Sequence, residues 1–170
     1  VIMRNEIITG NKKSLYTKAD NKTLAYAEKT LRAYGIEPKP CGHGLSALIG
    51  SGEPCILLRA DMDALPLDEP PGCTFRSEHP GMMHACGHDA HTAMLLGTVK
   101  ALKAMEKDIK CCVKFIFQSA EEILGGAKTL CEDGLMDQVD EIIACHINAE
   151  RMTNQFSINR TCNSACSRGF

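Results

Sequence analysis

Short apolar segments alternate along this chain of 170 residues with segments in which apolar residues recur at helical spacing. The helical pattern predicts helices over residues 21–34 and 89–105, and a third, shorter helix over 126–132. The apolar runs between them have the length of single strands. The expected strands are residues 45–49, 55–60, 111–118 and 141–145. Strands that alternate with helices predict an α/β fold, a mostly parallel sheet flanked by helices.

Turn and capping residues suggest where several of these elements begin and end. Gly35 follows the first helix at the position of a C′ glycine, and Asp89 is a natural N-cap for the second. Gly50-Ser51-Gly52 predicts a tight turn between the first two strands. Residues 66–84 are rich in Pro, Gly and charge, which indicates a long surface loop. The tail from 148 is polar, and within it only residues 155–158 look like a strand.

The charge and hydropathy of the chain exclude some partners. The formal net charge is -2, without a long run of one sign, so nothing favours nucleic acid or a membrane surface as a partner. The longest apolar runs, such as 113–117, are far too short to cross a membrane. The N-terminal segment lacks the apolar core of a signal peptide, and we therefore expect a cytoplasmic protein.

Ten cysteines are many for a chain of this length. In a small secreted protein they would indicate a disulfide framework. However, four of them lie within apolar runs that look like buried strands, where thiols behave as small apolar side chains. These four are Cys55, Cys111, Cys112 and Cys145. With no signal peptide in view, reduced cysteines are the favoured interpretation.

Three of the expected strands are followed by side chains that can bind a metal. Asp61 and Asp63 follow the second strand, Glu121 and Glu122 follow the third, and His146 follows the fourth. Ligands of an open α/β sheet bind beyond the carboxyl ends of its strands. One such ending is unremarkable, because charged residues often follow strands, but three together predict a site at this edge.

The segment from residue 84 to residue 91 adds softer ligands. It contains His84, Cys86, His88, Asp89 and His91. Cys and His two positions apart, with glycine between them, can place a thiolate and an imidazole on one ion. The alternative is a loop before a helix that merely contains histidines, which is the better interpretation of a lone histidine. This density of nitrogen and sulfur ligands favours a metal similar to zinc.

The adjacent Glu121 and Glu122 allow two interpretations. One carboxylate can bind a metal while its neighbour serves a bound water as general base. Alternatively, the two form a solvated acidic pair at a helix start, where negative charge is favourable. A closed structural zinc site is a rival for the cysteines. The other close pairs, Cys111–Cys112 and Cys162–Cys166, do not look like halves of a zinc ribbon.

Three motifs carry a family resemblance. They are residues 59–66 (RADMDALP), 83–91 (MHACGHDAH) and 115–122 (FIFQSAEE), the last followed by Gly-Gly-Ala at 125–127. In order and spacing they resemble the aminoacylase/carboxypeptidase-type metal-dependent amidohydrolases. That family includes hippurate hydrolases, indoleacetyl-amino acid hydrolases and N-acetyldiaminopimelate deacetylases. The resemblance covers about residues 20–160.

The resemblance implies a fold, a cofactor and an activity. The family has a zinc-peptidase-like α/β catalytic domain, interrupted by a lid domain that usually dimerises. Two divalent ions, Zn or Mn, serve the hydrolysis of the amide bond of N-acyl amino acids or small peptide-like substrates. By the same resemblance, Glu121 is the general base, and Asp63 supports the metal site by contacting the ligands and does not itself bind the metal. The implied metal ligands are Cys86, His88, Glu122 and His146.

The chain also departs from the family pattern. We expect residues 1–20 to be a poorly defined segment, 21–150 a partial catalytic domain, and 151–170 the start of a connection to an absent lid domain. A truncated chain of this kind is expected to hold one ion or none and to be incomplete as an enzyme. The alternatives are a non-catalytic metal-binding or interaction module and a redox or structural cysteine-rich protein. The sequence leaves open the acyl group, the amino acid, the metal and the roles of His84, Asp89 and His91.

Overall fold

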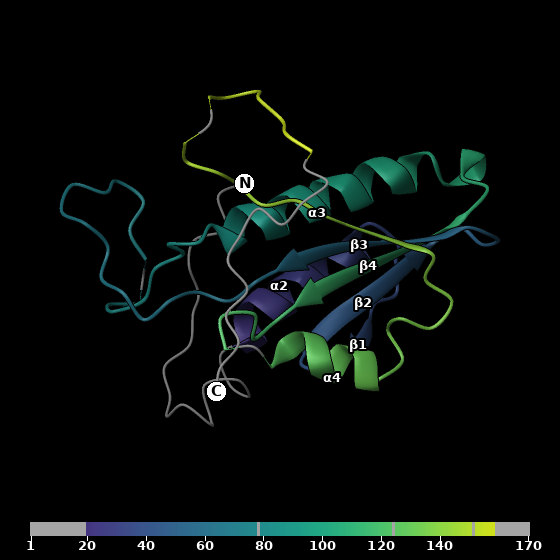
Figure 1. The fold of residues 1–170 in the computed structure, drawn as a ribbon, viewed down its shortest axis with the longest axis horizontal. Helices are drawn as coiled ribbons and strands as arrows, with labels where there is room; N and C mark the ends of the chain where they lie inside the picture. Colours follow the sequence, from purple (N-terminus) through teal and green to yellow (C-terminus); the bar gives the residue numbers. More distant parts are fainter. Residues whose placement is uncertain (1–19, 78, 124, 151, 159–170) are drawn as a thin grey trace.

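The computed structural model describes residues 20–158, except residues 78, 124 and 151. It is an α/β structure, with a five-stranded sheet between helices (Figure 1). In chain order the elements are α2 (Asp20–Ala33), β1 (Lys39–Cys41), β2 (Gly44–Ile49), β3 (Cys55–Asp61), α3 (His88–Ala104), the 3₁₀ turn η1 (Glu106–Asp108), β4 (Cys112–Gln118), α4 (Gly126–Glu132) and β5 (Glu141–Ala144). Residues 1–19, and with them nearly all of the expected poorly defined segment, lie outside this description, as does the chain beyond 158.

The sheet has the strand order β1-β2-β4-β3-β5 and is mixed. β3 pairs in parallel with both β4 and β5, whereas β2 is antiparallel to β1 and to β4. The turn at residues 50–52 was expected to join two neighbouring strands. Instead β4 lies between β2 and β3, and its backbone pairs with both.

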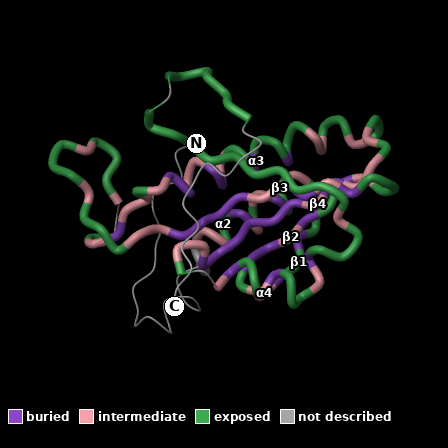
Figure 2. The backbone as a smooth tube through the Cα atoms, viewed as in Figure 1, coloured by how far each residue is buried: buried purple, intermediate pink, exposed green. Residues whose placement is uncertain are grey.

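Side chains of β4 alternate between the two faces of the sheet and build a core on each. Phe115 and Phe117 are fully buried on the face covered by α2 and α3, where they join Leu31 and Val99. Ile116 points to the other face, where Leu130 of α4 packs with it. Figure 2 shows β2, β3 and β4 as the buried centre of the molecule, with more exposed chain around them.

The loop expected at residues 66–84 is present, and its two ends are fastened together. The N–H of Leu65 donates to the carbonyl of Met83 at 2.9 Å, and the N–H of Met83 donates back at 3.0 Å. This short bridge brings the residues that follow Met83 next to the end of β3. The bridge thereby brings the two motifs together, although the described residues of the loop between them form no helix or strand.

Two cap predictions have different outcomes. Gly35 has the expected left-handed backbone, with φ of 75°, and the N–H of Ile36 reaches back to the carbonyl of Leu31 at 3.0 Å, which closes α2. The prediction that Asp89 is an N-cap is wrong. α3 begins at His88, its N-cap is Gly87 with φ of 84°, and no side chain caps it. Asp89 lies in the first turn, where negative charge favours the helix.

The end of the described chain differs most from expectation. Residues 141–145 were expected to form a buried strand, but all four residues of β5 and also Cys145 are exposed. Among the described strands, β5 lies at the edge of the sheet and pairs with β3 alone. Residues 155–158 have no regular structure, so the strand expected there is wrong. The sequence analysis also missed the short strand β1, because its middle residue is Pro40.

The cysteines among the described residues have free thiols. Four of them were expected to be buried in strands, and this expectation is met in part. Cys55 is buried, and Cys111 and Cys112 are half-buried. Cys162 and Cys166 lie beyond the described residues. No helix among residues 20–158 combines the length and the apolar character that crossing a membrane requires.

Candidate metal centre

The site lies at one end of the sheet, where three neighbouring parallel strands finish. β4, β3 and β5 end at Gln118, Asp61 and Ala144, and the residues that follow them face the N-terminus of α3 (Figure 1). The acidic residues and the histidine that follow these strands, and the segment from His84 to His91, therefore meet in space. The structure brings together every residue that the sequence analysis named as a metal ligand.

Cys86, His88 and His146 form the first group of potential ligands. One ligand atom from each lies within 4.8 Å of the others, and the Sγ of Cys86 is 3.3 Å from the Nε2 of His146. The left-handed backbone of Gly87 turns the chain between Cys86 and His88. A thiol and two imidazoles are a donor set that suits zinc.

His88 belongs to each of the three potential ligand groups found among the described residues: the first group, a second with Glu121 and Glu122, and a third with Asp61 and His91. It is 1% exposed, and its Nε2 lies 3.7 Å from Oε1 of Glu122 and 4.0 Å from Oε2 of Glu121. The two glutamates follow β4, so this second group joins the carboxylates to the Cys–His loop. On the other side of the ring, Nδ1 lies 3.4 Å from Oδ1 of Asp63.

Asp63 connects two parts of the site through its two oxygens. Its Oδ2 accepts a hydrogen bond from the backbone N–H of Glu122 at 2.9 Å, while its Oδ1 faces His88. Asp63 is 6% exposed. A buried carboxylate of this kind fixes the backbone that carries the glutamates relative to the ring of His88.

Asp61 and His91 form a buried pair that the sequence analysis did not identify. The Nδ1 of His91 lies 2.6 Å from Oδ1 of Asp61, and Nη1 of Arg59 lies 2.8 Å from its Oδ2. Burial raises the pKa of Asp61, but the hydrogen bond with His91 and the positive charges of Arg59 and His88 outweigh it and lower the pKa to about 2. The pair is 30 residues apart in sequence. The available signal was the position of Asp61 at the end of an apolar strand.

The surroundings of the site disfavour additional negative charge. Burial raises the pKa of the Cys86 thiol to about 11, and the nearby carboxylates of Glu122 and Glu121 contribute. The pKa of Glu122 is raised by burial and by Glu121 and Asp63. Burial lowers the pKa of His88, but Asp63, Asp61 and Glu122 raise it overall. A cation placed among these groups would relieve this repulsion.

Several polar atoms at the site are buried without a partner, which is the strongest indication that a metal fits here. Within the described part of the chain, both ring nitrogens of His88, Oδ1 of Asp63 and Oε1 of Glu122 have no hydrogen-bond partner. Unpaired buried groups are costly and rare in native proteins, and a bound ion is one recognised explanation. The donors present, sulfur, imidazole nitrogen and carboxylate oxygen, are those of a zinc or manganese site.

His84 belongs to none of the three ligand groups, although it lies in the same loop. Its Nδ1 is buried and has no partner in the described structure, and burial lowers its pKa. The sequence left the roles of both His84 and His91 open. Both ring nitrogens of His91 form hydrogen bonds beside the site, whereas Nδ1 of His84 forms none among the described residues.

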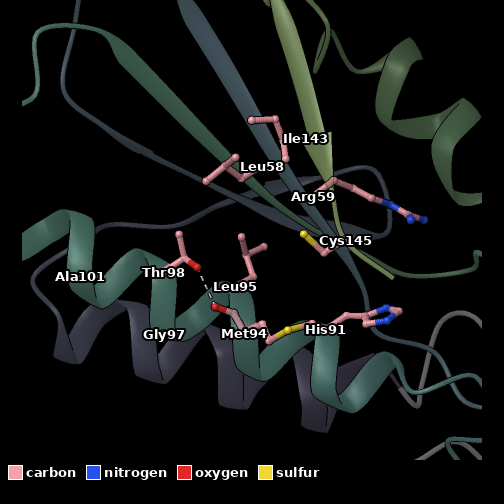
Figure 3. A pocket seen from close by; sticks show the side chains of 10 residues that line it. All are labelled: Leu58, Arg59, His91, Met94, Leu95, Gly97, Thr98, Ala101, Ile143 and Cys145. Atoms are coloured by element: carbon pink, nitrogen blue, oxygen red, sulfur yellow. Dashed lines mark hydrogen bonds between the residues drawn. The ribbon is translucent and has the colours of Figure 1, made fainter. Parts of the chain in front are cut away.

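A largely apolar groove of about 540 Å³ adjoins the site (Figure 3). It runs between α3, which contributes Met94 and Leu95, and the strands β3 and β5, which contribute Leu58 and Ile143. His91 lies at one end of the groove and connects it to the metal-ligand groups.

Comparisons with known proteins agree with this geometry. The model of peptidase family M20/M25/M40 matches residues 57–161. The chain is 42% identical over 133 residues to an N-acyl-L-amino acid amidohydrolase of Geobacillus stearothermophilus. This alignment covers 75% of this chain and 36% of the relative. It is 38% identical over 146 residues to IAA-amino acid hydrolase ILR1-like 4 of Arabidopsis thaliana, which covers 85% of this chain and 32% of the relative.

A solved structure shows the same fold. The YXEP protein of Bacillus subtilis, described as a dinuclear metal binding peptidase from the M20 family, superposes with a TM-score of 0.73 at 37% sequence identity. The match covers 78% of this chain and 38% of that one. The chain thus spans about a third of the length of the curated relatives it matches. The motifs, the fold and the matched residues show that the chain belongs to peptidase family M20/M25/M40.

Proposed function

We propose that this chain supplies part of a divalent metal centre that hydrolyses the amide bond of N-acyl amino acids. The observation that carries the proposal is the convergence of Cys86, His88 and His146 within 4.8 Å, next to the Glu121–Glu122 pair. Relatives named as an N-acyl-L-amino acid amidohydrolase, an N-acetyl-L-cysteine deacetylase and IAA-amino acid hydrolases support the reaction class.

Four side chains would hold the metal. Cys86, His88 and His146 would provide sulfur and nitrogen ligands, and Glu122 would add a carboxylate through its unpartnered Oε1. Divalent ions at such a site supply Lewis acidity, which polarises an amide carbonyl and makes water easier to deprotonate. Sulfur and imidazole ligands favour zinc mildly, and manganese is the second candidate.

Glu121 is the proposed general base. Its side chain is 38% exposed, whereas that of Glu122 is 24% exposed, and its Oε2 lies slightly farther from His88. The better exposed carboxylate can reach water and substrate, while the more buried one faces the metal ligands. Glu121 would accept a proton from the attacking water and return it to the leaving amine, because both steps need a group that changes its protonation state.

Asp63 is proposed to hold this arrangement in place. It lies against Nδ1 of His88 and accepts the backbone N–H of Glu122, so it can orient one ligand through its ring and another through its backbone. Substrates are proposed to be N-acyl amino acids or small peptide-like amides. From the family resemblance, the complete enzyme would dimerise through a lid domain.

The first test is metal binding by the 170-residue chain, measured by calorimetric titration with Zn²⁺ and with Mn²⁺. Cys86→Ser should weaken Zn²⁺ binding at least tenfold, because the thiolate is the soft ligand of the set. Cys131→Ser is the matched control, since Cys131 is exposed and belongs to none of the described ligand groups. Equal binding by both variants and the parent chain would contradict the proposed site.

The second test is hydrolysis of N-acetyl and N-benzoyl amino acids by the metal-loaded chain and by Glu121→Gln. Glu121→Gln should keep the metal and lower kcat by a factor of about 10² to 10⁴, which is the usual contribution of a general base. Metal binding without turnover by the parent chain is the result expected of a partial catalytic domain as well as of a non-catalytic metal-binding module. Undiminished turnover by Glu121→Gln would remove Glu121 from the mechanism.

A further inference from the structure

Ile147, the residue directly after the proposed ligand His146, makes three contacts, two through its backbone and one through its side chain. Its N–H donates to Nε2 of His91 at 3.0 Å, and its carbonyl accepts from Nδ1 of His146 at 2.6 Å. Its side chain lies over Gly87, since a Cβ on Gly87 would come within 2.1 Å of Cδ1 of Ile147. Ile147 therefore touches the loop that carries the other two ligands of the first group.

The hydrogen bonds determine which tautomer of His91 is present. Because Nε2 accepts the N–H of Ile147, the ring proton belongs to Nδ1, which donates to Asp61. Asp61 is in turn paired with Arg59. These contacts form a continuous chain from Asp61 at the end of β3, through His91 of α3, to Ile147, the residue after His146. Both Asp61 and His91 are buried.

Besides these hydrogen bonds, the ring of His146 meets two other rings edge-on: its centroid lies 4.6 Å from that of His91 and 6.3 Å from that of His88. Its own ring is exposed, and it follows β5, an exposed edge strand that pairs only with β3 among the described strands. The bond from its Nδ1 to the carbonyl of Ile147 leaves Nε2 directed at Cys86. Where Nε2 lies therefore depends on where the backbone of Ile147 is held, and His91 holds that backbone through its N–H.

We propose that His91 is a positioning residue for the metal centre: by accepting the N–H of Ile147, it aims Nε2 of His146 at Cys86 and His88. This inference rests on the proposed metal centre. It assigns the role to Nε2 of His91, whereas a purely structural role for the buried Asp61–His91 pair would need only Nδ1. The roles of the two ring nitrogens can be separated experimentally, because an Asn amide can take the place of Nδ1 and a Gln amide the place of Nε2.

The informative variants are His91→Asn and His91→Gln. The shorter Asn amide lies where Nδ1 was, so it can donate to Asp61 but cannot reach Ile147. The longer Gln amide lies near the place of Nε2, so its oxygen can accept the N–H of Ile147 while the bond to Asp61 is lost. His43→Asn is the control, because His43 is an exposed histidine in the turn between β1 and β2.

The first measurement is amide hydrogen exchange at Ile147 in the metal-free chain. Ile147 is 44% exposed, and its N–H donates to His91, so protection of this N–H reports on that bond. Parent chain, His91→Gln and His43→Asn should show a protected amide, and His91→Asn should lose at least tenfold in protection. An equally protected amide in His91→Asn would overturn the inference.

The second measurement is titration with Co²⁺, whose thiolate charge-transfer absorption reports on Cys86. His91→Asn should bind Co²⁺ at least tenfold more weakly, within the 10- to 100-fold usual for residues that orient metal ligands, and His91→Gln within about threefold of the parent chain. Weak binding by His91→Gln overturns the inference even if His91→Asn fails to fold. If the parent chain binds Co²⁺ and His91→Asn binds it equally well, only this inference fails. If the parent chain takes up no Co²⁺, the proposed metal centre fails and this role with it.

Discussion

Gly126, the first residue of α4, should tolerate no side chain at all. It is buried, its N–H donates to the carbonyl of Ala120 at 3.1 Å, and together these residues close the loop that carries Glu121 and Glu122. A Cβ built on Gly126 would lie 1.9 Å from the carbonyl oxygen of Ser119 and 3.0 Å from its carbonyl carbon. Both atoms belong to the backbone, so no flexible side chain can move aside.

The cost of Gly126→Ala follows from this distance. Ordinary contact begins near 3.4 Å, so the Cβ and the Ser119 oxygen must separate by about 1.5 Å, the difference between 3.4 and 1.9 Å. Overpacking of a buried site costs typically about 1–3 kcal/mol. The higher helix propensity of Ala relative to Gly offsets at most about 1 kcal/mol of this loss in stability. Because a contact of 1.9 Å is far below ordinary contact, the upper end of this range applies, and about 3 kcal/mol less an offset of at most about 1 kcal/mol leaves an expected loss of about 2–3 kcal/mol in the free energy of unfolding, together with displacement of the two glutamates.

Urea unfolding of the metal-free chain, followed by far-UV circular dichroism, measures this loss. Gly97→Ala is the matched control, because Gly97 lies inside α3 and a Cβ there would meet nothing within 4 Å. It should raise the free energy of unfolding by about 0.5–1 kcal/mol through helix propensity. A Gly126→Ala chain as stable as the parent chain would refute the argument from close packing. Zn²⁺ titration of both variants then shows whether the glutamates have moved.

Three further predictions concern the core, a thiol and the Cys–His loop. Phe115→Ala should cost about 3–5 kcal/mol in the same unfolding assay, because Phe115 is fully buried; a loss below 1 kcal/mol would contradict the packing described. Burial and the neighbouring thiol of Cys55 raise the pKa of Cys112 to about 11, so the thiol is protonated at neutral pH. Its alkylation by iodoacetamide, followed by peptide mass spectrometry, should therefore accelerate about tenfold per unit from pH 8 to pH 10, and a flat rate would refute the shift. Gly87→Ala should weaken Zn²⁺ binding at least tenfold, because its φ is 84° and its Cβ would strike Ile147; unchanged affinity would show that the loop adapts.

The sequence predicted the elements that have a strong local pattern. α2, α3, β3 and β4 lie within a few residues of their expected bounds, since apolar periodicity and strand-length runs depend on neighbours in the chain. The convergence of acidic residues and His146 at one sheet edge was also predictable, because parallel strands present their carboxyl ends together. Confirmation of the fold class and of the family follows from the comparisons with known proteins.

What the sequence could not predict depends on contacts between distant residues. The insertion of β4 between β2 and β3 depends on pairing across more than fifty residues, which no turn signal encodes. The pair formed by Asp61 and His91 depends on how α3 packs against β3. The choice of Gly87 over Asp89 as N-cap depends on the bend that brings Cys86 and His88 together. The roles assigned to the site residues stay predictions until the variants are measured.

The place of β4 in the sheet has a consequence for synthesis on the ribosome. β2 and β3 both pair with β4 but not with each other, so β3 has no neighbour in the sheet until Gln118 has been made. Fifty-seven residues separate Asp61 from Gln118 (118 minus 61), which corresponds to about 3–11 s at 5–20 residues per second. During that interval the nascent chain carries an unpaired apolar strand that includes Leu57. This is the stretch where a chaperone that recognises extended apolar segments would bind during translation.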